Sequence, residues 1–151
     1  MTGEAVAVLK SHPNIVGLKE ASGNISQVCH IAAHISDDFN IYSGNDDQTV
    51  PILSLGGIGC ISTVSNIIPA RFSRMIHHYL EGRVRMAGAE QVALKPLIDA
   101  VFTEVNPIPI KSALYMMGMC NLEYRLPLCP PSNKTQYLLY DELSRNGLLS
   151  L

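Results

Sequence analysis

The alternation of strand-like and helix-like segments in the first 68 residues is the feature that most constrains the fold. Three short apolar runs have the length of strands, and each follows a segment whose apolar residues recur at helical spacing. Because strands that alternate with helices form βα units, the sequence predicts a parallel sheet. In order, the helical segments are residues 2–11, 24–35 and 47–55, and the strands are residues 14–19, 39–43 and 59–64.

Beyond residue 68 the pattern is entirely helical. Three strands do not close a barrel, and a complete (β/α)8 barrel needs about 250 residues, whereas this chain has 151. An open three-stranded sheet leaves two edges and one face to be covered. The predicted helices are residues 69–81, 84–102, 110–117 and 133–145, with an extended connection at 126–131.

Lys19 stands at the end of the first apolar run, which Pro13 precedes and Ser22 follows. Lysine is seldom fully buried unless a partner or a reaction uses it. At the end of a buried strand, burial would favour the neutral amine, which attacks carbonyl carbons, so we predict a Schiff-base lysine. The alternative is a side chain that extends its ammonium group to solvent. On this segment alone, both interpretations stay open.

The composition excludes several classes of partner. The net charge is −2 and no basic run occurs, so we expect no nucleic-acid partner. No apolar stretch is long enough to cross a membrane, and the first residues do not resemble a secretory signal. The four cysteines are scattered, which favours buried, reduced thiols in the cytoplasm over disulfides or a zinc site.

Four other patterns have a functional and a structural interpretation, and the structural one is favoured in each. Residues 56–59 precede a strand, so a helix C-cap and turn is favoured over a phosphate cradle. The acidic pair at 46–47 opens a helix, where it interacts with the helix dipole. His30 and His34 lack the glutamate of a His-Glu-x-x-His motif, and residues 77–78 lie on a solvated helix face. We therefore predict no metal site.

Four segments resemble the dihydrodipicolinate synthase (4-hydroxy-tetrahydrodipicolinate synthase) family in order and spacing. They are HPNIVGLKEASGN at 12–24, YSGNDD at 42–47, GGIGCIS at 56–62 and NPIPIK at 106–111. The lysine motif is shared with the wider pyruvate-dependent class I aldolases, including N-acetylneuraminate lyase, whereas NPIPIK is more particular to the synthases. The resemblance covers essentially the whole chain, but only the C-terminal half of the family's protein.

The resemblance implies an α/β fold, namely the C-terminal part of a (β/α)8 TIM barrel followed by an all-helical extension. Residues 1–68 would be a partial barrel holding strands six to eight, and residues 69–151 the last barrel helix and the extension. The sheet that does not close would then belong to a larger barrel.

The resemblance also implies site residues. Lys19 falls on the family's Schiff-base lysine, and side-chain parity puts it on one face with Ile15 and Gly17, where Gly17 clears space beside it. Ile61 matches a position whose main chain contacts pyruvate. Gly44 and Asn45 lie at the mouth of the same site.

Other catalytic groups of the family precede the first residue of this chain. They are a Thr-Thr pair, a proton-relaying tyrosine and a substrate-binding arginine. None of the six tyrosines here sits in a matching motif, and a core or capping role is favoured for Tyr42.

The implied activity is condensation of pyruvate with aspartate semialdehyde, in lysine and diaminopimelate biosynthesis, with no cofactor. We expect a cytoplasmic chain that turns over little alone and forms a homo-oligomer or complements a separate N-terminal half. Two alternatives stay open. One is another pyruvate-dependent aldolase of the N-acetylneuraminate lyase type, and the other is a non-catalytic half-barrel.

Overall fold

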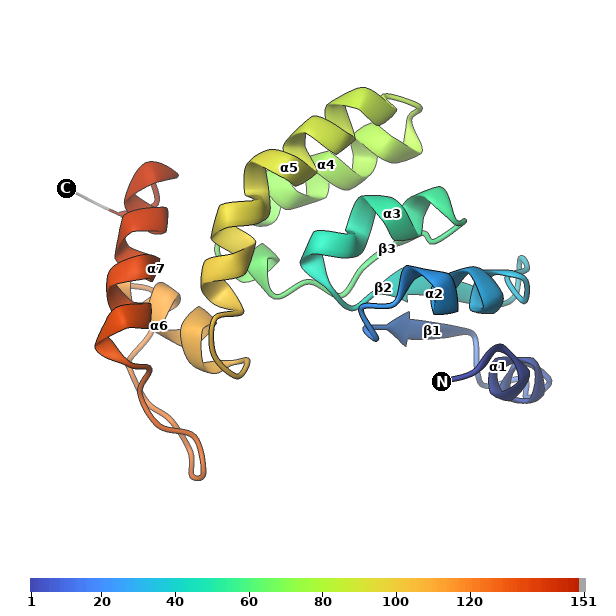
Figure 1. Cartoon of the computed structure of the whole chain (residues 1–151), viewed down its shortest axis with the longest axis horizontal. Helices are drawn as coiled ribbons and strands as arrows, with labels where there is room; N and C mark the ends of the chain where they lie inside the picture. Colours follow the sequence, from blue (N-terminus) through green and yellow to red (C-terminus); the bar gives the residue numbers. More distant parts are fainter. Residues whose placement is uncertain (150–151) are drawn as a thin grey trace. The chain divides into compact units, whose positions relative to one another are not determined.

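The computed structural model describes residues 1–149, and these form a three-stranded parallel sheet, seven α-helices and two 3-10 helices (Figure 1). The sheet has the order β1-β2-β3. The elements are α1 (Gly3–Lys10), β1 (Gly17–Glu20), α2 (Ile25–Ala32), β2 (Asn40–Ser43), η1 (Asp46–Gln48), α3 (Thr49–Ser54), β3 (Gly59–Cys60), η2 (Val64–Asn66), α4 (Pro69–Leu80), α5 (Val84–Val101), α6 (Ile108–Met116) and α7 (Asn133–Arg145). The predicted α/β pattern with a parallel sheet is confirmed.

The residues that begin and end the early helices follow from local chemistry. The Thr2 hydroxyl accepts a hydrogen bond from the Ala5 N–H at the start of α1, and the Asn24 side chain accepts one from the Gln27 N–H at the start of α2. After α3, Gly56 has φ +91° and donates its N–H to the Leu53 carbonyl. The predicted helix C-cap at residues 56–59 is therefore confirmed.

Two of the strands differ from their predicted bounds by more than one residue. The run at 14–19 becomes a strand only at Gly17, because the Ile15 N–H first closes a turn onto the His12 carbonyl. The third strand ends at Cys60, and Val64 already belongs to η2. The helix predicted at 47–55 begins as the 3-10 turn η1 before α3.

A hydrophobic core lies between the sheet and the first three helices. Ile41 of β2 is 1% exposed, and Leu18 of β1, its partner in the ladder, packs against the same cluster. Figure 1 shows α2 and α3 running along one side of β1 and β2. Each such buried side chain stabilises the fold by about 1.5–3 kcal/mol. The cluster consists of Val6, Val28, Ile31, Phe39, Ile41 and Ile52.

The chain forms two compact units, which we describe separately. The first comprises Met1–Ser62 and Arg74–Gln91, and the second Thr63–Ser73 and Val92–Leu151. The first unit holds the sheet. The division into residues 1–68 and 69–151 that the family resemblance implies stays a prediction.

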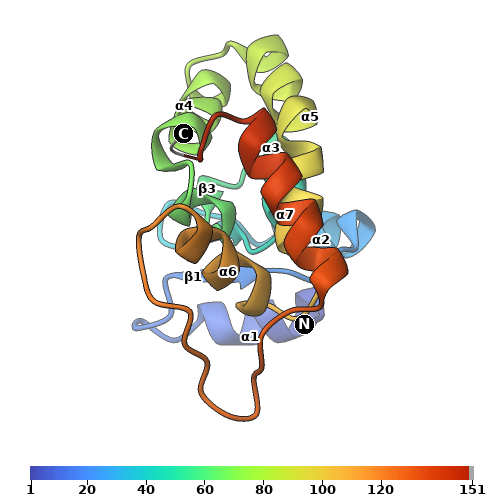
Figure 2. The same ribbon diagram turned by 90° about the vertical axis from the view of Figure 1, so that its left-hand side faces the viewer.

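In the second unit α6 and α7 pack side by side, and the loop that joins them extends away from both helices (Figure 2). The Tyr124 hydroxyl anchors this loop by donating to the Ile108 carbonyl at 3.1 Å and by sharing a hydrogen bond with Ser112 at 2.7 Å. The connection predicted to be extended contains a turn, in which the Leu128 N–H donates to the Arg125 carbonyl.

Candidate functional site

Lys19 lies near the carboxyl end of β1, on the face that the helices leave uncovered. Its neighbour Leu18 points into the core, so parity directs the Lys19 side chain the other way. The described residues leave Lys19 exposed, whereas the next residue, Glu20, is 4% exposed. Of the two interpretations left open for Lys19, the described residues therefore show the one in which its side chain reaches solvent.

The strand register places other residues on the same face as Lys19. Lys19 is the direct partner of Tyr42, and Tyr42 is the partner of Gly59, so these three positions form a row across the sheet. Tyr42 is half-buried, and its ring carbons lie 3.5 Å from where a Cβ on Gly59 would stand. This row forms the floor of the candidate site.

Gly44 brings the loop after β2 against the end of β1. Its N–H donates to the Glu20 carbonyl at 2.7 Å. A Cβ on Gly44 would stand 2.9 Å from Lys19 Cε and 2.7 Å from the Ala21 Cβ. At Gly17, by contrast, the nearest atoms to an added Cβ belong to the Asn40 main chain, at 2.8 Å. The sequence had suggested that Gly17 provides the space beside the lysine. In the structure Gly44 provides it.

Asn45 and Ile61 are held by the backbone at the end of β2. The Ser43 hydroxyl donates to the Asn45 carbonyl at 2.7 Å and accepts from the Asn45 N–H at 3.3 Å, which fixes the turn into η1. The Ile61 N–H donates to the Ser43 carbonyl at 2.8 Å, and the Ile61 side chain is 51% exposed. A main-chain contact from Ile61 to a substrate would therefore use its carbonyl oxygen. All the predicted site residues gather at the carboxyl end of the sheet.

A polar cluster that sequence reasoning missed lies behind this end of the sheet, on the helix side. Ser43 and Cys60 are ladder partners on that face, and Asp46 and Thr49 are buried beside them. Burial raises the pKa of the Cys60 thiol to about 11, and a hydrogen bond with Thr49 offsets this only partly. The only available signal in the sequence was the run of small polar residues after each strand.

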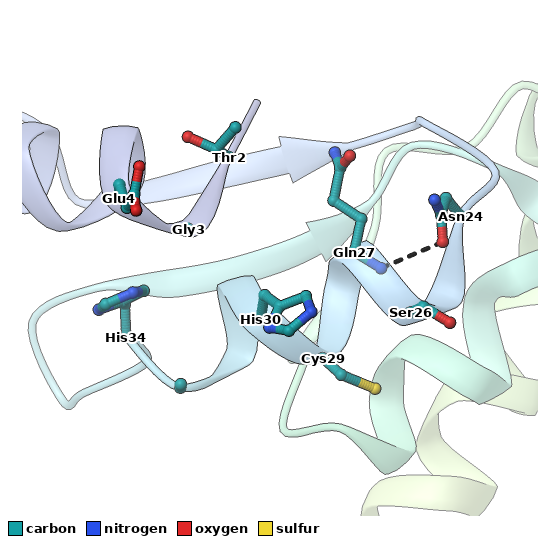
Figure 3. Close-up of a pocket in the computed structure, with 10 residues that line it drawn as sticks. Thr2, Gly3, Glu4, Asn24, Ser26, Gln27, Cys29, His30 and His34 are labelled. Atoms are coloured by element: carbon teal, nitrogen blue, oxygen red, sulfur yellow. Dashed lines mark hydrogen bonds between the residues drawn. The ribbon is translucent and has the colours of Figure 1, made fainter.

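A separate open hollow, about 730 Å³ in volume, lies between the N-terminus of α1 and one side of α2 along its length (Figure 3). His30 and His34 line it, but α2 ends at Ala32, so the two imidazoles do not share a helix face. Across residues 1–149 no cluster of three or more histidine, cysteine, aspartate or glutamate side chains is placed to hold a metal ion. Lys19 is not among the residues that line this hollow.

The cysteines and the helices allow two further statements about residues 1–149. Cys29, Cys120 and Cys129 are exposed thiols and Cys60 is partly buried, so the prediction that the cysteines are buried is largely wrong. Among the helices described, none combines the length and the apolar character that a membrane span needs.

Comparison with known proteins places these observations in one family. The sequence profile of the Dihydrodipicolinate synthetase family matches residues 1–146. The 4-hydroxy-tetrahydrodipicolinate synthase of Thermoanaerobacter sp. (strain X514) is 48% identical over 150 residues, which are 99% of this chain and 50% of the relative.

Solved structures show the same likeness. The dihydrodipicolinate synthase from Thermotoga maritima is 40% identical with a TM-score of 0.94, over 97% of this chain and 51% of that one. The chloride-inhibited dihydrodipicolinate synthase from Acinetobacter baumannii, solved in complex with pyruvate, is 29% identical with a TM-score of 0.92, over 98% of this chain and 51% of that one. The chain spans about half the length of the relatives it matches, and it belongs to the dihydrodipicolinate synthetase family.

Proposed function

We propose that this chain acts as the C-terminal half of a 4-hydroxy-tetrahydrodipicolinate synthase, with Lys19 as the residue that forms a Schiff base with pyruvate. The observation that carries the proposal is the position of Lys19 at the carboxyl end of a parallel strand, on the face opposite the hydrophobic core. Catalytic groups of (β/α)8 barrels occupy this place. The pyruvate complex of the Acinetobacter baumannii relative supports the choice of the first substrate.

The chemistry begins with attack of the Lys19 amine on the keto carbon of pyruvate. The carbonyl oxygen leaves as water, and the resulting iminium withdraws electrons from the methyl carbon. Loss of a methyl proton gives an enamine, whose carbon adds to the aldehyde carbon of aspartate semialdehyde. The amino group of the semialdehyde then attacks the iminium carbon, which closes the ring and releases Lys19. Pyruvate and the semialdehyde are thus joined with loss of one water.

The positions of the groups around Lys19 support a role for each of them in substrate binding. The Ile61 carbonyl and the Gly44–Asn45 turn lie at the same end of the sheet as Lys19, where they would contact the bound pyruvate and the incoming aldehyde. In the family architecture we assign β1, β2 and β3 to barrel strands six, seven and eight. We assign the helices beyond residue 68 to the last barrel helix and a C-terminal extension.

A partner that covers the uncovered face of the sheet forms part of this proposal. Lys19 is exposed among the described residues, so the dry surroundings that favour a neutral amine would come from residues outside them. Within the described sheet β1 and β3 each pair with β2 alone, which leaves outer edges suited to further strands. We propose a separate N-terminal half, or a second copy of this chain, as that partner. We expect the assembly in the cytoplasm and little turnover by the chain alone.

Borohydride trapping tests the role of Lys19. The 151-residue chain is incubated with pyruvate and sodium borohydride, and the adduct is located by intact mass and peptide mapping. We expect the adduct on Lys19 and its absence in Lys19→Arg, while Lys10 and Lys134 of the same sample serve as internal controls. A folded chain whose label is spread evenly over its lysines would rule out a reactive carbonyl site in the chain alone.

The non-catalytic half-barrel remains the second candidate, because the exposure of Lys19 is what a purely structural lysine would show. Light scattering, with and without an added N-terminal half from a relative, separates the two. Trapping that appears or accelerates only in the mixed complex supports the synthase, whereas a complex that never traps pyruvate supports the structural role.

A further inference from the structure

We infer that Gly44 is a positioning residue for Lys19, and that the lack of a side chain at position 44 creates the channel in which the lysine stem lies. The inference rests on the proposed role of Lys19. The hydrogen bond from the Gly44 N–H to the Glu20 carbonyl, at 2.7 Å, fixes position 44 beside the end of β1. A Cβ there would stand 2.9 Å from Lys19 Cε. This is closer than the separation of about 3.5–4 Å at which carbon atoms make favourable contact.

The backbone conformation of Gly44 gives no other reason for glycine. The glycines that need a positive φ are Gly23, Gly56, Gly82, Gly118 and Gly147, and Gly44 is not one of them. An L-residue could therefore adopt the Gly44 backbone, and only the surrounding atoms exclude one. Those atoms are Lys19 Cε, the Ala21 Cβ and, at 3.1 Å, the Glu20 carbonyl oxygen.

The other glycines on this face of the sheet differ from Gly44. At Gly17 the obstructing atoms belong to the Asn40 backbone, so a side chain there would disturb the β1–β2 ladder itself. At Gly59 the nearest atoms are Tyr42 ring carbons at 3.5 Å and beyond, which is an ordinary contact. Gly44 is thus the glycine on this face whose replacement would press directly on the lysine.

A methyl group at position 44 would displace Lys19 Cε by about 0.5–1 Å, because carbon atoms settle about 3.5–4 Å apart. The amine at the end of the stem would move with it. A nucleophile misplaced by about 1 Å can lose about a hundredfold in rate. We therefore expect Gly44→Ala to slow iminium formation without removing the amine.

In the single variant Gly44→Ala, the added Cβ also lies 2.7 Å from the Ala21 Cβ. This second clash could lower the stability of the variant. The double variant Ala21→Gly with Gly44→Ala removes this second clash and keeps the contacts with Lys19 Cε and, at 3.1 Å, with the Glu20 carbonyl oxygen. Ala21→Gly alone is its matched reference. Gly88→Ala, which adds a methyl group in α5 where no atom lies within 4 Å of it, is the control for the general effect of replacing a glycine.

The test measures two quantities in each variant. One is the rate of pyruvate trapping on Lys19, and the other is the melting temperature by circular dichroism. We expect the double variant to trap about ten- to a hundredfold more slowly than Ala21→Gly at an unchanged melting temperature. Gly88→Ala should stay within about twofold of the wild-type chain. Reductive methylation of Lys19 by formaldehyde, which needs no oriented amine, should be unaffected. Equal pyruvate trapping in Ala21→Gly and in the double variant would overturn the inference while leaving the proposed function intact.

A second readout does not depend on pyruvate. Nuclear Overhauser spectra of the wild-type chain should show a cross-peak between a Gly44 Hα and the Lys19 Hε protons. If Lys19 forms no adduct either in the wild-type chain alone or in the mixed complex, the proposed function fails, and this cross-peak then decides the positioning inference separately. Its presence would support the contact between the two residues, and its absence would overturn it.

Discussion

Tyr42 pairs with Lys19 across the β1–β2 ladder, and both side chains belong to the face opposite Ile41. The phenol ring packs over Gly59, so its contribution is expected to come from contact area and not from its hydroxyl. This row of three positions forms the floor on which the candidate site is built.

We expect Tyr42→Phe to leave the free energy of unfolding within about 0.5 kcal/mol of wild type. Tyr42→Ala, which removes a half-buried ring, should cost about 1–3 kcal/mol. Urea unfolding followed by circular dichroism measures both values. A loss of pyruvate trapping in Tyr42→Phe, with stability retained, would instead indicate that the hydroxyl takes part in proton transfer.

Cys60 should be the slowest thiol to react with iodoacetamide. Alkylation requires the thiolate, and burial raises the pKa of Cys60 to about 11, so little thiolate exists at pH 8. Compared with a thiol of ordinary pKa, the rate should fall by about a hundredfold, and it should rise with pH up to about pH 11. The exposed Cys29 in the same sample is the internal control. Equal labelling of the two thiols at pH 8 would contradict the buried position of Cys60.

The Gln91 side chain joins the start of α3 to η1 within the first unit. Its carbonyl oxygen accepts from the Val50 N–H at 3.1 Å, and its amide donates to the Asp46 carbonyl at 3.0 Å. Gln91→Leu removes both hydrogen bonds and should cost about 2–4 kcal/mol of the free energy of unfolding.

Gln91→Glu provides the matched control for the Gln91 contacts. The introduced carboxylate keeps the acceptor for Val50 but faces the Asp46 carbonyl without a donor. Protonation restores that donor, so the loss of stability should be smaller at pH 4 than at pH 7 in denaturant titrations. A cost that does not change with pH would show that the contact with Asp46 contributes little.

The helices and the sheet type could be predicted because their signals are local. Thr2 and Asn24 are N-caps by side-chain chemistry alone, and the predicted span of α7, residues 133–145, agrees with the structure. The parallel pairing of the strands followed from the βα alternation. The strand bounds were less accurate, because the turn at His12 and Ile15 and the early end of β3 depend on which residues find ladder partners.

The burial within the site could not be predicted, because it depends on what covers each face. The sequence shows that the Lys19 and Glu20 side chains point to opposite faces of the sheet. Only the packing of the helices decides that Glu20 is buried and Lys19 is exposed. Similarly, Gly17 is two residues from Lys19 along the strand, whereas Gly44 lies beside it across the sheet. Contacts between distant segments leave no trace in a local pattern.

The contact of Glu104 with the start of α7, 28 residues further along the chain, is such a long-range feature and supports a prediction about pH. Its carboxylate accepts hydrogen bonds from the Thr135 hydroxyl at 2.7 Å, the Ser132 hydroxyl at 2.8 Å and the Ser132 N–H at 3.0 Å. These donors lower the pKa of Glu104 below its usual value of 4.5, with the Thr135 hydroxyl contributing most.

Because the folded state holds Glu104 at a lower pKa than the unfolded chain, its contribution to stability is present above about pH 4.5 and is lost as the pH falls through the folded pKa. Glu104→Gln should therefore lower the melting temperature at pH 7, and the difference from wild type should shrink in acid. Carbon-13 titration of the carboxyl group measures the pKa directly. In Thr135→Val, which removes the strongest donor but keeps the shape, the pKa of Glu104 should rise towards its usual value. A titration that Thr135→Val leaves unchanged would mean that the hydroxyl does not hold this carboxylate in solution.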